Sequence, residues 1–338
     1  MLNDVTPEDD IGGQATFLRN IIPYLAVQYE VRLLSLPRTY QNIRWIPRRF
    51  LYMVFILYKF RVIRKADIIF SNTPESAFVA TFFNGKRLFH IFHGNTNPIT
   101  TSKFWYGKYF RSVFVAFDKR ILEKSRKCYT VGEDREGCSF LYQPIDTAFL
   151  KSIPALLQQR KDFLFVGRLE EVKQVDKILL AFKEYLLLAG GNDQLIICGT
   201  GILEEKYHKL CRDLGLQDNV QFTGKRKYEE VIALMKSAKV LLMASLYEGF
   251  PMVIAEAQCC GLPVLSSDVG SISKVIRNGV NGMLLPIQFT SAQYAGAIQD
   301  LLNLYPGITA ESIKRAKDFD AEYLVKNVLL NDFEERSV

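Results

Sequence analysis

The sequence contains few of the residues that bind metals or form disulfides. Its three histidines, His90, His93 and His208, are too few and too scattered to suggest a zinc site. The six cysteines include no CxxC pair and fall mostly in apolar stretches, which is typical of reduced core thiols in a cytoplasm. The sequence therefore predicts no metal site, no disulfide framework and a cytoplasmic location.

Long hydrophobic runs are absent as well. The longest apolar run, 50–58, has about half the length of a membrane span and is flanked by Arg48, Arg49 and Lys59. Residues 1–10 contain four acidic residues instead of a basic and apolar leader, so we expect no signal for secretion. What remains is a globular chain of 338 residues with 49% hydrophobic content, enough for two domains of ordinary size.

Short β-rich segments alternate with longer helical segments, which predicts an α/β fold with parallel sheets covered by helices on both faces. The expected strands lie near 31–36, 67–71, 88–92, 127–131 and 139–143 in the first half, and near 163–166, 194–198, 220–222, 240–243, 263–266 and 283–285 in the second. The first strand looks clipped, because only Met1, Leu2 and Val5 precede a polar turn.

Two Rossmann-like units follow from this pattern. The strand pattern stops near 146–160, so we expect an N-terminal domain over 1–150 and a C-terminal domain over 151–320. A cleft between two such domains would bring the carboxyl ends of both sheets face to face.

The segment from Glu248 to Glu256 places two carboxylates around a glycine turn at the start of a short helix. Pro251 at the first helical position and Gly261 after the last one are the expected start and stop signals. The backbone amides of this turn have no partner inside the helix and favour an anion. They belong to the run Gly249-Phe250-Pro251-Met252-Val253.

The spacing of the two carboxylates suits a nucleotide-sugar. Glu248 lies beside the anion site, and Glu256 lies roughly 8 Å further along the helix axis. One carboxylate can therefore meet hydroxyls on one side of a bound diphosphate, and the other can meet hydroxyls on the far side. An ordinary surface helix with a glutamate in its first turn is an equally good interpretation of these residues alone.

A second motif, Gly167-Arg168-Leu169, follows the strand 163–166 and precedes Lys173 by four residues. Both cations can hold a phosphate, arginine as a bidentate fork and lysine as a point charge. Surface pairing of the two cations with Glu170 and Glu171 is the alternative, and for an isolated pair it is the favoured one.

Two glycine-containing turns add weaker information. Gly12-Gly13 precedes a helical segment, where a plain tight turn is the simplest interpretation. Gly199-Thr200-Gly201 follows the strand 194–198, but Glu204 stands where a dinucleotide fingerprint has its third glycine. Hydride chemistry on a dinucleotide is therefore excluded.

Together these motifs resemble glycosyltransferase family 4, the retaining nucleotide-sugar transferases of GT-B fold, over nearly the whole chain. The matching positions are Gly12-Gly13, His93-Gly94, Gly167-Arg168-Leu169 with Lys173, and Glu248 with Glu256. The loop Thr223-Gly224-Lys225-Arg226 resembles the family's loop that holds the nucleotide base. Departures are Gln174, where the family often has glycine, and the clipped first strand.

The resemblance implies a role for each of these residues. Arg168, Lys173 and the amides between Gly249 and Val253 would neutralise the departing diphosphate without a metal, so no cofactor is expected besides the UDP- or GDP-sugar donor. Glu248 would hold the donor sugar, Glu256 the ribose, and His93 would lie near sugar and acceptor. A neutral core histidine is the alternative for His93. The last helix, 321–338, would cross back to the N-terminal domain.

The segment 31–66 is strongly cationic and contains no acidic residue. Its cations are Arg32, Arg38, Arg44, Arg48, Arg49, Lys59, Arg61, Arg64 and Lys65. With aromatic residues such as Trp45 and Phe50 between them, this segment can lie on an anionic inner leaflet and serve a lipid-linked acceptor. A buried helix with a solvated basic rim is an equal alternative, and no nucleic-acid-binding motif is present.

Two functional hypotheses follow. The favoured one is a hexosyltransferase that builds a cell-surface polysaccharide or glycolipid. The other is a non-catalytic GT-B-like module that binds a nucleotide or a membrane. Retention of all four residues Arg168, Lys173, Glu248 and Glu256 favours catalysis.

Overall fold

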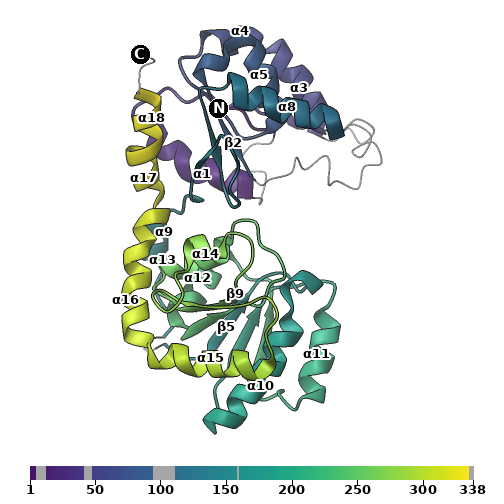
Figure 1. The fold of residues 1–338 in the computed structure, drawn as a ribbon, viewed down its shortest axis with the longest axis vertical. Coiled ribbons are helices and arrows are strands. Elements are labelled where there is room, and N and C mark those ends of the chain that lie inside the picture. Colours follow the sequence, from purple (N-terminus) through teal and green to yellow (C-terminus); the bar gives the residue numbers. More distant parts are fainter. Residues whose placement is uncertain (5–12, 42–47, 94–110, 158–159, 335–338) are drawn as a thin grey trace. The chain divides into compact units, whose positions relative to one another are not determined.

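The computed structural model describes residues 1–4, 13–41, 48–93, 111–157 and 160–334, and the structural statements below concern these residues. The chain forms two compact units (Figure 1). Unit 1 comprises Met1–Pro144 with Ala321–Val338, and unit 2 comprises Ile145–Asp320. The chain thus passes into unit 2 after Pro144, slightly before the expected boundary at residue 150, and returns to unit 1 at Ala321.

Unit 1 contains a parallel sheet in the order β1-β2-β3-β4. Its strands are β1 Ile69–Ser71, β2 Leu88–Phe92, β3 Lys127–Thr130 and β4 Ser139–Phe140. The strand predicted over 31–36 is wrong, because Leu34 forms only an isolated bridge to Leu2. Leu2 also bridges to Ser71. Backbone hydrogen bonds also join Leu34 to Met1 and Asn3, and the Leu36 amide donates to the Asp4 carbonyl at 3.4 Å. The described parts of the two segments thus lie side by side without forming a ladder of successive residue pairs.

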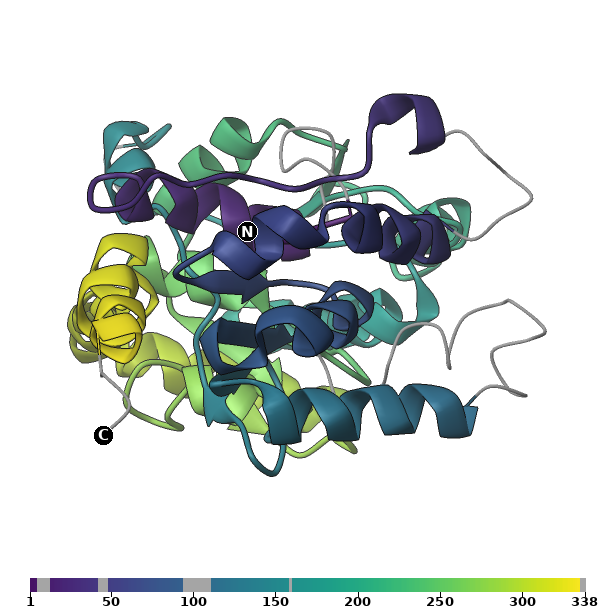
Figure 2. The ribbon, with the colours of Figure 1, turned by 90° about the horizontal axis from the view of Figure 1, so that it is seen from above.

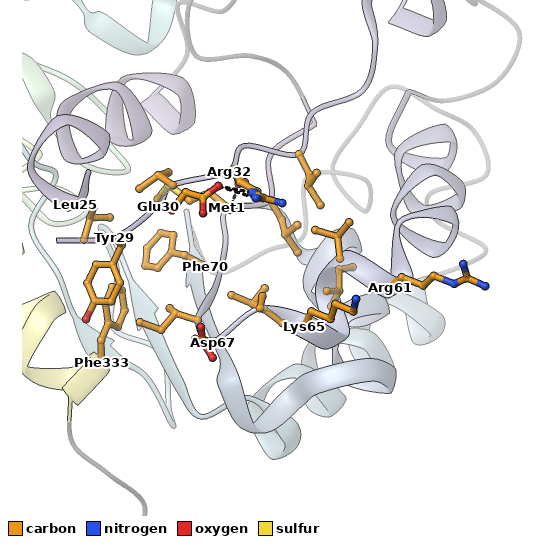
Figure 3. A pocket seen from close by; sticks show the side chains of 18 residues that line it. Met1, Leu25, Tyr29, Glu30, Arg32, Arg61, Lys65, Asp67, Phe70 and Phe333 are labelled. Atoms are coloured by element: carbon orange, nitrogen blue, oxygen red, sulfur yellow. Dashed lines mark hydrogen bonds and ion pairs between the residues drawn. The ribbon is translucent and has the colours of Figure 1, made fainter. Parts of the chain in front are cut away.

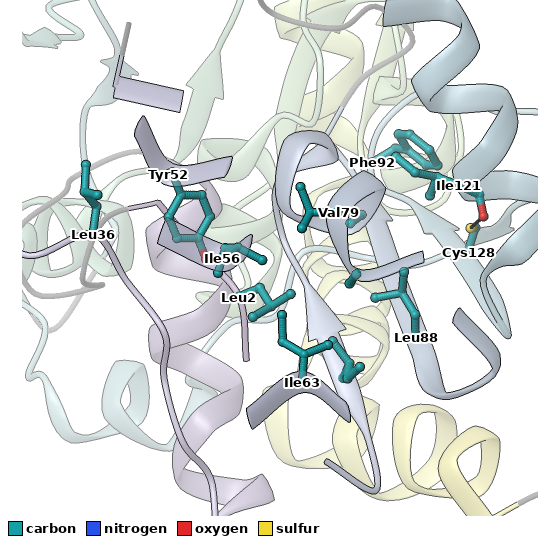
Figure 4. Close-up of a cluster of buried hydrophobic side chains, with 13 residues drawn as sticks. Leu2, Leu36, Tyr52, Ile56, Ile63, Val79, Leu88, Phe92, Ile121 and Cys128 are labelled. Atoms are coloured by element: carbon teal, nitrogen blue, oxygen red, sulfur yellow. Dashed lines mark hydrogen bonds between the residues drawn. The ribbon is translucent and has the colours of Figure 1, made fainter. Parts of the chain in front are cut away.

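One face of this sheet is covered by helices α3 Arg48–Tyr58, α4 Phe60–Lys65, α5 Pro74–Asn84 and α8 Arg111–Lys124. Helix α5 packs on β2 and lies between α3 and α8 (Figure 2). Leu88 belongs to a buried apolar cluster with Tyr52, Ile56 and Val79 (Figure 4). Ile69 of β1 is part of the same cluster. Two short elements, α2 Arg38–Gln41 and η1 Gly85–Arg87, complete this part of the chain.

The opposite face is covered by α1 Gly13–Leu25 and by the end of the chain, which forms α17 Ala321–Leu324, a π-helical turn over Val325–Leu329 and α18 Leu330–Glu334. Because side chains alternate along a strand, Phe70 and Phe89 point to this face. Phe333 packs on both rings, with centroid distances of 6.4 and 4.6 Å. Asp332 pairs with Lys127 and accepts a hydrogen bond from the Tyr129 hydroxyl at 2.6 Å.

Unit 2 contains a six-stranded parallel sheet in the order β10-β9-β8-β5-β6-β7. Its strands are β5 Phe163–Val166, β6 Leu195–Cys198, β7 Val220–Gly224, β8 Val240–Leu242, β9 Val264–Ser267 and β10 Met283–Leu285. The predicted α/β class with parallel sheets is confirmed. The chain runs from β5 outward to β7 and then returns to the other side of β5, so the strand order reverses between β5 and β8.

The helices of unit 2 connect these strands and flank the sheet (Figure 1). They are α9 Thr147–Ser152, α10 Val175–Ala189, α11 Glu204–Asp213, α12 Tyr228–Ser237, α13 Met252–Cys259, α14 Ile272–Val275, α15 Ser291–Asn303 and α16 Tyr305–Arg315, with short 3-10 turns η2 Glu171–Lys173 and η3 Ala316–Phe319. Among the described segments of the whole chain, no helix combines the length and the apolar character needed to span a membrane.

Candidate functional site

Two loops meet where the strand order of unit 2 reverses. One loop leaves the carboxyl end of β5 and contains Lys173, and the other leaves the carboxyl end of β8 and contains Glu248. The Lys173 Nζ donates a hydrogen bond to Glu248 Oε1 at 2.5 Å, and the Leu246 amide donates to the Val172 carbonyl at 2.8 Å. Ligands of open α/β sheets bind outside the carboxyl ends of the strands at such a reversal. The structure therefore brings two predicted site residues together at the position that favours binding.

The Lys173–Glu248 pair is largely removed from solvent. Only 15% of the lysine side chain and 11% of the glutamate side chain are exposed. Each residue supplies the charge that the other needs, since an unpaired buried charge would be costly. The site can therefore hold a cation and an acceptor of hydroxyl hydrogen bonds side by side before any ligand arrives.

The loop after β5 takes its path because two glycines of the neighbouring loop allow close contact. A Cβ atom on Gly199 would lie 1.9 Å from the Gly167 carbonyl oxygen, and one on Gly201 would lie 2.3 Å from that of Leu169. The Leu169 amide donates to the Thr200 carbonyl at 3.0 Å. The Gly199-Thr200-Gly201 turn thus has a structural task, which is to hold the segment that leads to Lys173.

The Glu248 carboxylate is held in place by serines that the sequence did not single out. The Ser245 hydroxyl donates to Glu248 Oε1 at 2.7 Å, and the Ser267 hydroxyl donates to the Ser245 carbonyl at 2.6 Å. Ser267 ends β9, the strand beside β8. The contact between Ser267 and Ser245 therefore depends on the strand order, which local sequence patterns do not reveal.

The turn that contains Glu248 also packs against the loop after β9. Gly270 has a positive φ of 58°, and a Cβ atom there would lie 1.8 Å from the Glu248 carbonyl oxygen. The Ser271 hydroxyl donates to the Gly249 carbonyl at 2.5 Å. In the sequence, the only sign of this contact is that Gly270 and Ser271 follow shortly after the strand β9.

Arg168 adopts the surface pairing that the sequence also allowed. Its guanidinium donates to Glu170 at 2.6 Å, and 72% of the side chain is exposed. Lys173 does not behave in the same way, because it pairs with Glu248 and not with Glu171. The structure thus joins only one of the two predicted cations to the carboxylate site.

The predicted anion site at the start of α13 needs a correction. Pro251 is the N-cap residue and not the first helical residue, since α13 begins at Met252. Pro251 has no N–H group, and the Met252 amide donates to the Phe250 carbonyl at 3.0 Å. Of the predicted set, the amides of Gly249 and Val253 are the donors that we assign to an anion. A Cβ atom on Gly249 would have no neighbour within 4 Å, so a ligand can approach the backbone there.

Glu256 has a separate partner. The Tyr228 hydroxyl donates to Glu256 Oε1 at 3.0 Å. Burial raises the pKa of Glu256 to about 7, and the hydrogen bond from Tyr228 acts in the opposite direction. Tyr228 was not singled out in the sequence, although only Lys227 separates it from the predicted base-binding loop.

That loop, 223–226, leaves the carboxyl end of β7. Gly224 has a positive φ of 67°, and its carbonyl accepts a hydrogen bond from the Gly199 amide at 3.0 Å. Arg226, which precedes α12, pairs at 3.5 Å with Glu230 in the first turn of that helix. The loop therefore lies at the same edge of the sheet as Gly199 and the Lys173 loop.

His93 belongs to unit 1. Its Nε2 lies 2.5 Å from Asn72 Oδ1, and its ring meets Phe17 edge to face at 5.8 Å. Burial lowers the pKa of His93 to about 3, and the Arg49 guanidinium adds to the effect. His93 is therefore neutral at physiological pH. Gly13 is the first residue of α1, whereas Gly12 and Gly94 lie outside the described residues.

A cavity of about 610 Å³ in unit 1 is distinct from these residues. Leu25, Tyr29, Phe70 and Phe333 line its apolar side (Figure 3). Its lining includes none of the described residues predicted to bind the donor or to act in catalysis, although Arg32, Arg61 and Lys65 of the cationic segment take part in it. In the described ranges, no group of three or more His, Cys, Asp or Glu side chains is arranged to hold a metal ion.

Open parallel sheets of this kind commonly bind nucleotides where the strand order reverses, which is where Lys173 and Glu248 meet. The model of one family, described as glycosyl transferases group 1, matches residues 146–319, which is more than half of the chain. The protein belongs to this family.

Several known proteins are similar to this chain in sequence. The uncharacterized glycosyltransferase MJ1607 of Methanocaldococcus jannaschii is 35% identical over 135 residues, which cover 40% of this chain and 34% of that protein. The D-inositol 3-phosphate glycosyltransferase of Acidothermus cellulolyticus is 34% identical over 161 residues, which cover 45% and 35%. The matched segments thus span about a third of the length of these relatives.

Solved structures resemble the whole chain. The crystal structure of HepE from Anabaena in complex with UDP has a TM-score of 0.71 at 17% identity, with 98% of each chain covered. The lipopolysaccharide outer core galactosyltransferase WaaB has a TM-score of 0.66 at 19% identity, with 98% and 97% covered. At these identities the likeness shows the fold, which is GT-B with two Rossmann-like domains.

Proposed function

We propose that this protein is a retaining hexosyltransferase of glycosyltransferase family 4. It takes its sugar from a UDP- or GDP-linked donor and passes it to a glycan or lipid-linked acceptor of cell-surface polysaccharide or lipopolysaccharide biosynthesis. The observation that carries the proposal is the contact between Lys173 and Glu248 at the strand reversal of unit 2. The structural relatives with bound UDP and UDP-glucose support a nucleotide-sugar donor.

The chemistry requires fixed positive charge at the leaving group. When the bond between the anomeric carbon and the diphosphate breaks, negative charge develops on the phosphate oxygens and positive charge on the sugar ring. Preorganised cations and amides stabilise the first of these charges. Lys173, Arg168 and the amides of Gly249 and Val253 take this role, so the reaction needs no metal ion.

The carboxylates orient the donor. Glu248 accepts hydrogen bonds from hydroxyls of the sugar, and Glu256 accepts them from the ribose. His93, which is neutral, is the residue of unit 1 that we assign to the sugar and the acceptor. The acceptor hydroxyl attacks the anomeric carbon on the face that the diphosphate leaves, and its proton passes to a phosphate oxygen. No separate general base is then required.

Hydrolysis and transfer assays with a panel of nucleotide-sugars test this function. We expect turnover of one donor, and we expect it to persist in an excess of EDTA, because cationic side chains and amides neutralise the diphosphate. Activity that disappears in EDTA and returns with Mg²⁺ or Mn²⁺ would contradict metal independence. Binding of a nucleotide-sugar without turnover would favour the non-catalytic module instead.

A second proposal concerns the place where the protein acts. Helices α3 and α4 expose an apolar surface formed by Phe50, Val54, Leu57, Tyr58 and Val62. Exposed Arg61, Arg64 and Lys65 follow it, and no acidic residue occurs in 31–66. An apolar surface beside unbalanced cations is complementary to an anionic bilayer. We propose that this α3–α4 surface binds the inner leaflet of the cell membrane.

The cations nearest the start of α3 do not belong to this surface. Arg48 pairs with Asp4 at 3.0 Å. Arg49 pairs with Glu75 at 3.3 Å, and Glu75 is buried. Burial raises the pKa of Glu75, while Arg49 lowers it. These arginines hold unit 1 together, so membrane binding must depend on the cations of α4. Arg44 and Trp45 lie outside the described residues.

Vesicle co-sedimentation tests the membrane proposal. We expect binding to vesicles that contain phosphatidylglycerol, little binding to phosphatidylcholine alone, and release when salt rises well above about 0.1 M. The triple variant Arg61→Gln, Arg64→Gln, Lys65→Gln should lose most of this binding and keep donor hydrolysis. The control changes the same charge on α11 through Lys206→Gln, Lys209→Gln and Arg212→Gln, which are exposed. Equal loss in both triple variants, or equal binding to both kinds of vesicle, would contradict the proposal.

A further inference from the structure

Tyr228 connects three helices of unit 2. It is the first residue of α12 and directly follows the loop 223–226 and Lys227. Its hydroxyl donates to Glu256 Oε1 on α13 at 3.0 Å. Its ring stacks on Phe149 of α9, with a centroid distance of 6.3 Å and an angle of 5° between the ring planes. Two contacts, one of the ring and one of the hydroxyl, therefore hold the Tyr228 side chain in place.

The helix that carries Phe149 is itself attached to α12. Asp146 caps α9 by accepting a hydrogen bond from the Phe149 amide at 2.9 Å. Lys236 near the end of α12 donates to the Leu150 carbonyl at 2.6 Å and also to that of Ile153. These hydrogen bonds join α9 to α12 and so support the stack of Tyr228 on Phe149.

We propose that Tyr228 is a positioning residue for the donor, because its hydroxyl holds the Glu256 carboxylate in one orientation with Oε2 left to accept hydrogen bonds from the nucleoside hydroxyls. This inference rests on the proposed function, in which Glu256 binds the ribose. A free glutamate side chain on a helix samples several rotamers, and ordering it on binding costs entropy. Tyr228 orders it before the donor arrives, which is the general effect of preorganisation.

The charge of Glu256 is sensitive to the same contact. Burial raises the pKa of Glu256 to about 7, and the Tyr228 hydrogen bond lowers it. Cys259 ends the same helix, and Cys260 is its C-cap residue. On the elements packed against α13, Lys236 donates to α9 carbonyls, and Arg315 pairs with Asp318. Glu256 thus depends on Tyr228 for a hydrogen bond to its ionised form.

The direction of the pH effect follows. The nucleoside hydroxyls are donors and need an ionised Glu256, so nucleotide affinity should rise with pH up to a point above the pKa of Glu256 and then level off. Removal of the Tyr228 hydroxyl removes the interaction that lowers this pKa. The rising part of the profile then moves to higher pH, and the affinity lost at neutral pH returns in alkaline solution.

The variant Tyr228→Phe tests this inference, because it keeps the ring and its stack on Phe149. Binding of UDP and of GDP is measured by calorimetry across neutral and alkaline pH, together with donor KM and kcat. We expect a severalfold weaker affinity at neutral pH, recovery toward the wild-type value in alkaline solution, and a raised donor KM with little change in kcat. Phe149→Leu, which removes the stack, should raise KM in the same direction.

The matched control is Tyr185→Phe, which removes a hydroxyl that donates to Asp193 at 2.6 Å. Asp193 precedes β6 and so lies near the amino ends of the strands. Glu256 lies on α13, which follows the carboxyl end of β8. This control should leave the pH profile unchanged. A Tyr228→Phe protein with the wild-type profile and KM would overturn the inference while leaving the proposed function intact. A wild-type protein that neither binds a nucleotide nor turns over a donor would overturn the proposed function itself.

Discussion

Replacement of Lys173 by alanine is expected to lower kcat/KM for sugar transfer at least a hundredfold, about 2.7 kcal/mol of transition-state stabilisation. Two effects combine. The diphosphate loses a fixed cation close to the leaving oxygens, and Glu248 loses the partner that lies 2.5 Å away in the free protein. Because both side chains are largely buried, the folded state should also lose roughly 2 kcal/mol, which urea titration will measure.

The double variant Lys173→Ala, Glu248→Gln separates these effects. It removes the unpaired carboxylate, so stability should return toward the wild-type value while transfer stays low. Arg168→Ala provides a second comparison, with a tenfold loss of transfer and no change in stability, since its side chain is 72% exposed. Lys206→Ala on α11 serves as the neutral control. Wild-type turnover by Lys173→Ala would refute the assignment of this lysine to the diphosphate.

Substitution of Gly270 by alanine is expected to abolish transfer, although Gly270 is not one of the residues assigned to the donor. The new Cβ atom would lie 1.8 Å from the Glu248 carbonyl oxygen, so the turn that carries Glu248 must move. The positive φ of 58° adds backbone strain. Displacement of a packed segment and left-handed strain together should lower the free energy of unfolding by roughly 3 kcal/mol.

Gly279→Ala is the matched control for this experiment. Gly279 also has a positive φ, of 75°, but a Cβ atom there would meet nothing within 4 Å. This variant should therefore lose only the strain contribution, roughly 1 kcal/mol, and keep its activity. Melting temperature and donor hydrolysis are measured for both. If the two variants behave alike, the contact between Gly270 and Glu248 has no special importance for the site.

Strand prediction succeeded where burial on both faces leaves an uninterrupted apolar run. The segment 163–166, buried at three of its four positions, became β5 with the expected bounds. The segment 283–285 also became β10 with the expected bounds, although it lies at the edge of the sheet and is only half-buried. The segment 31–36 failed because a strand requires a ladder with a neighbouring segment, and among the described residues it forms one bridge, between Leu34 and Leu2. The intrinsic preference of these residues for extended structure does not reveal whether a neighbouring segment will form a ladder with them.

The candidate site shows the same division between local and long-range information. Motif spacing identified Lys173 and Glu248 as candidates, yet their contact depends on β5 and β8 being neighbours. Gly270 and Ser267 were missed because each acts on a residue about twenty positions away in the chain. Tyr228 was missed because its partners, Phe149 and Glu256, come from two other helices.

The late return of the chain to unit 1 has a consequence for biosynthesis. Phe333, which covers Phe70 and Phe89, leaves the ribosome after all of unit 2 has been made. The two ends of unit 2 contact each other, since the Ile145 amide donates to the Phe319 carbonyl at 2.7 Å. Unit 2 can therefore fold to completion while unit 1 still exposes aromatic rings on its sheet. During translation the part made first is the part finished last, and in that interval a chaperone has an apolar surface to bind.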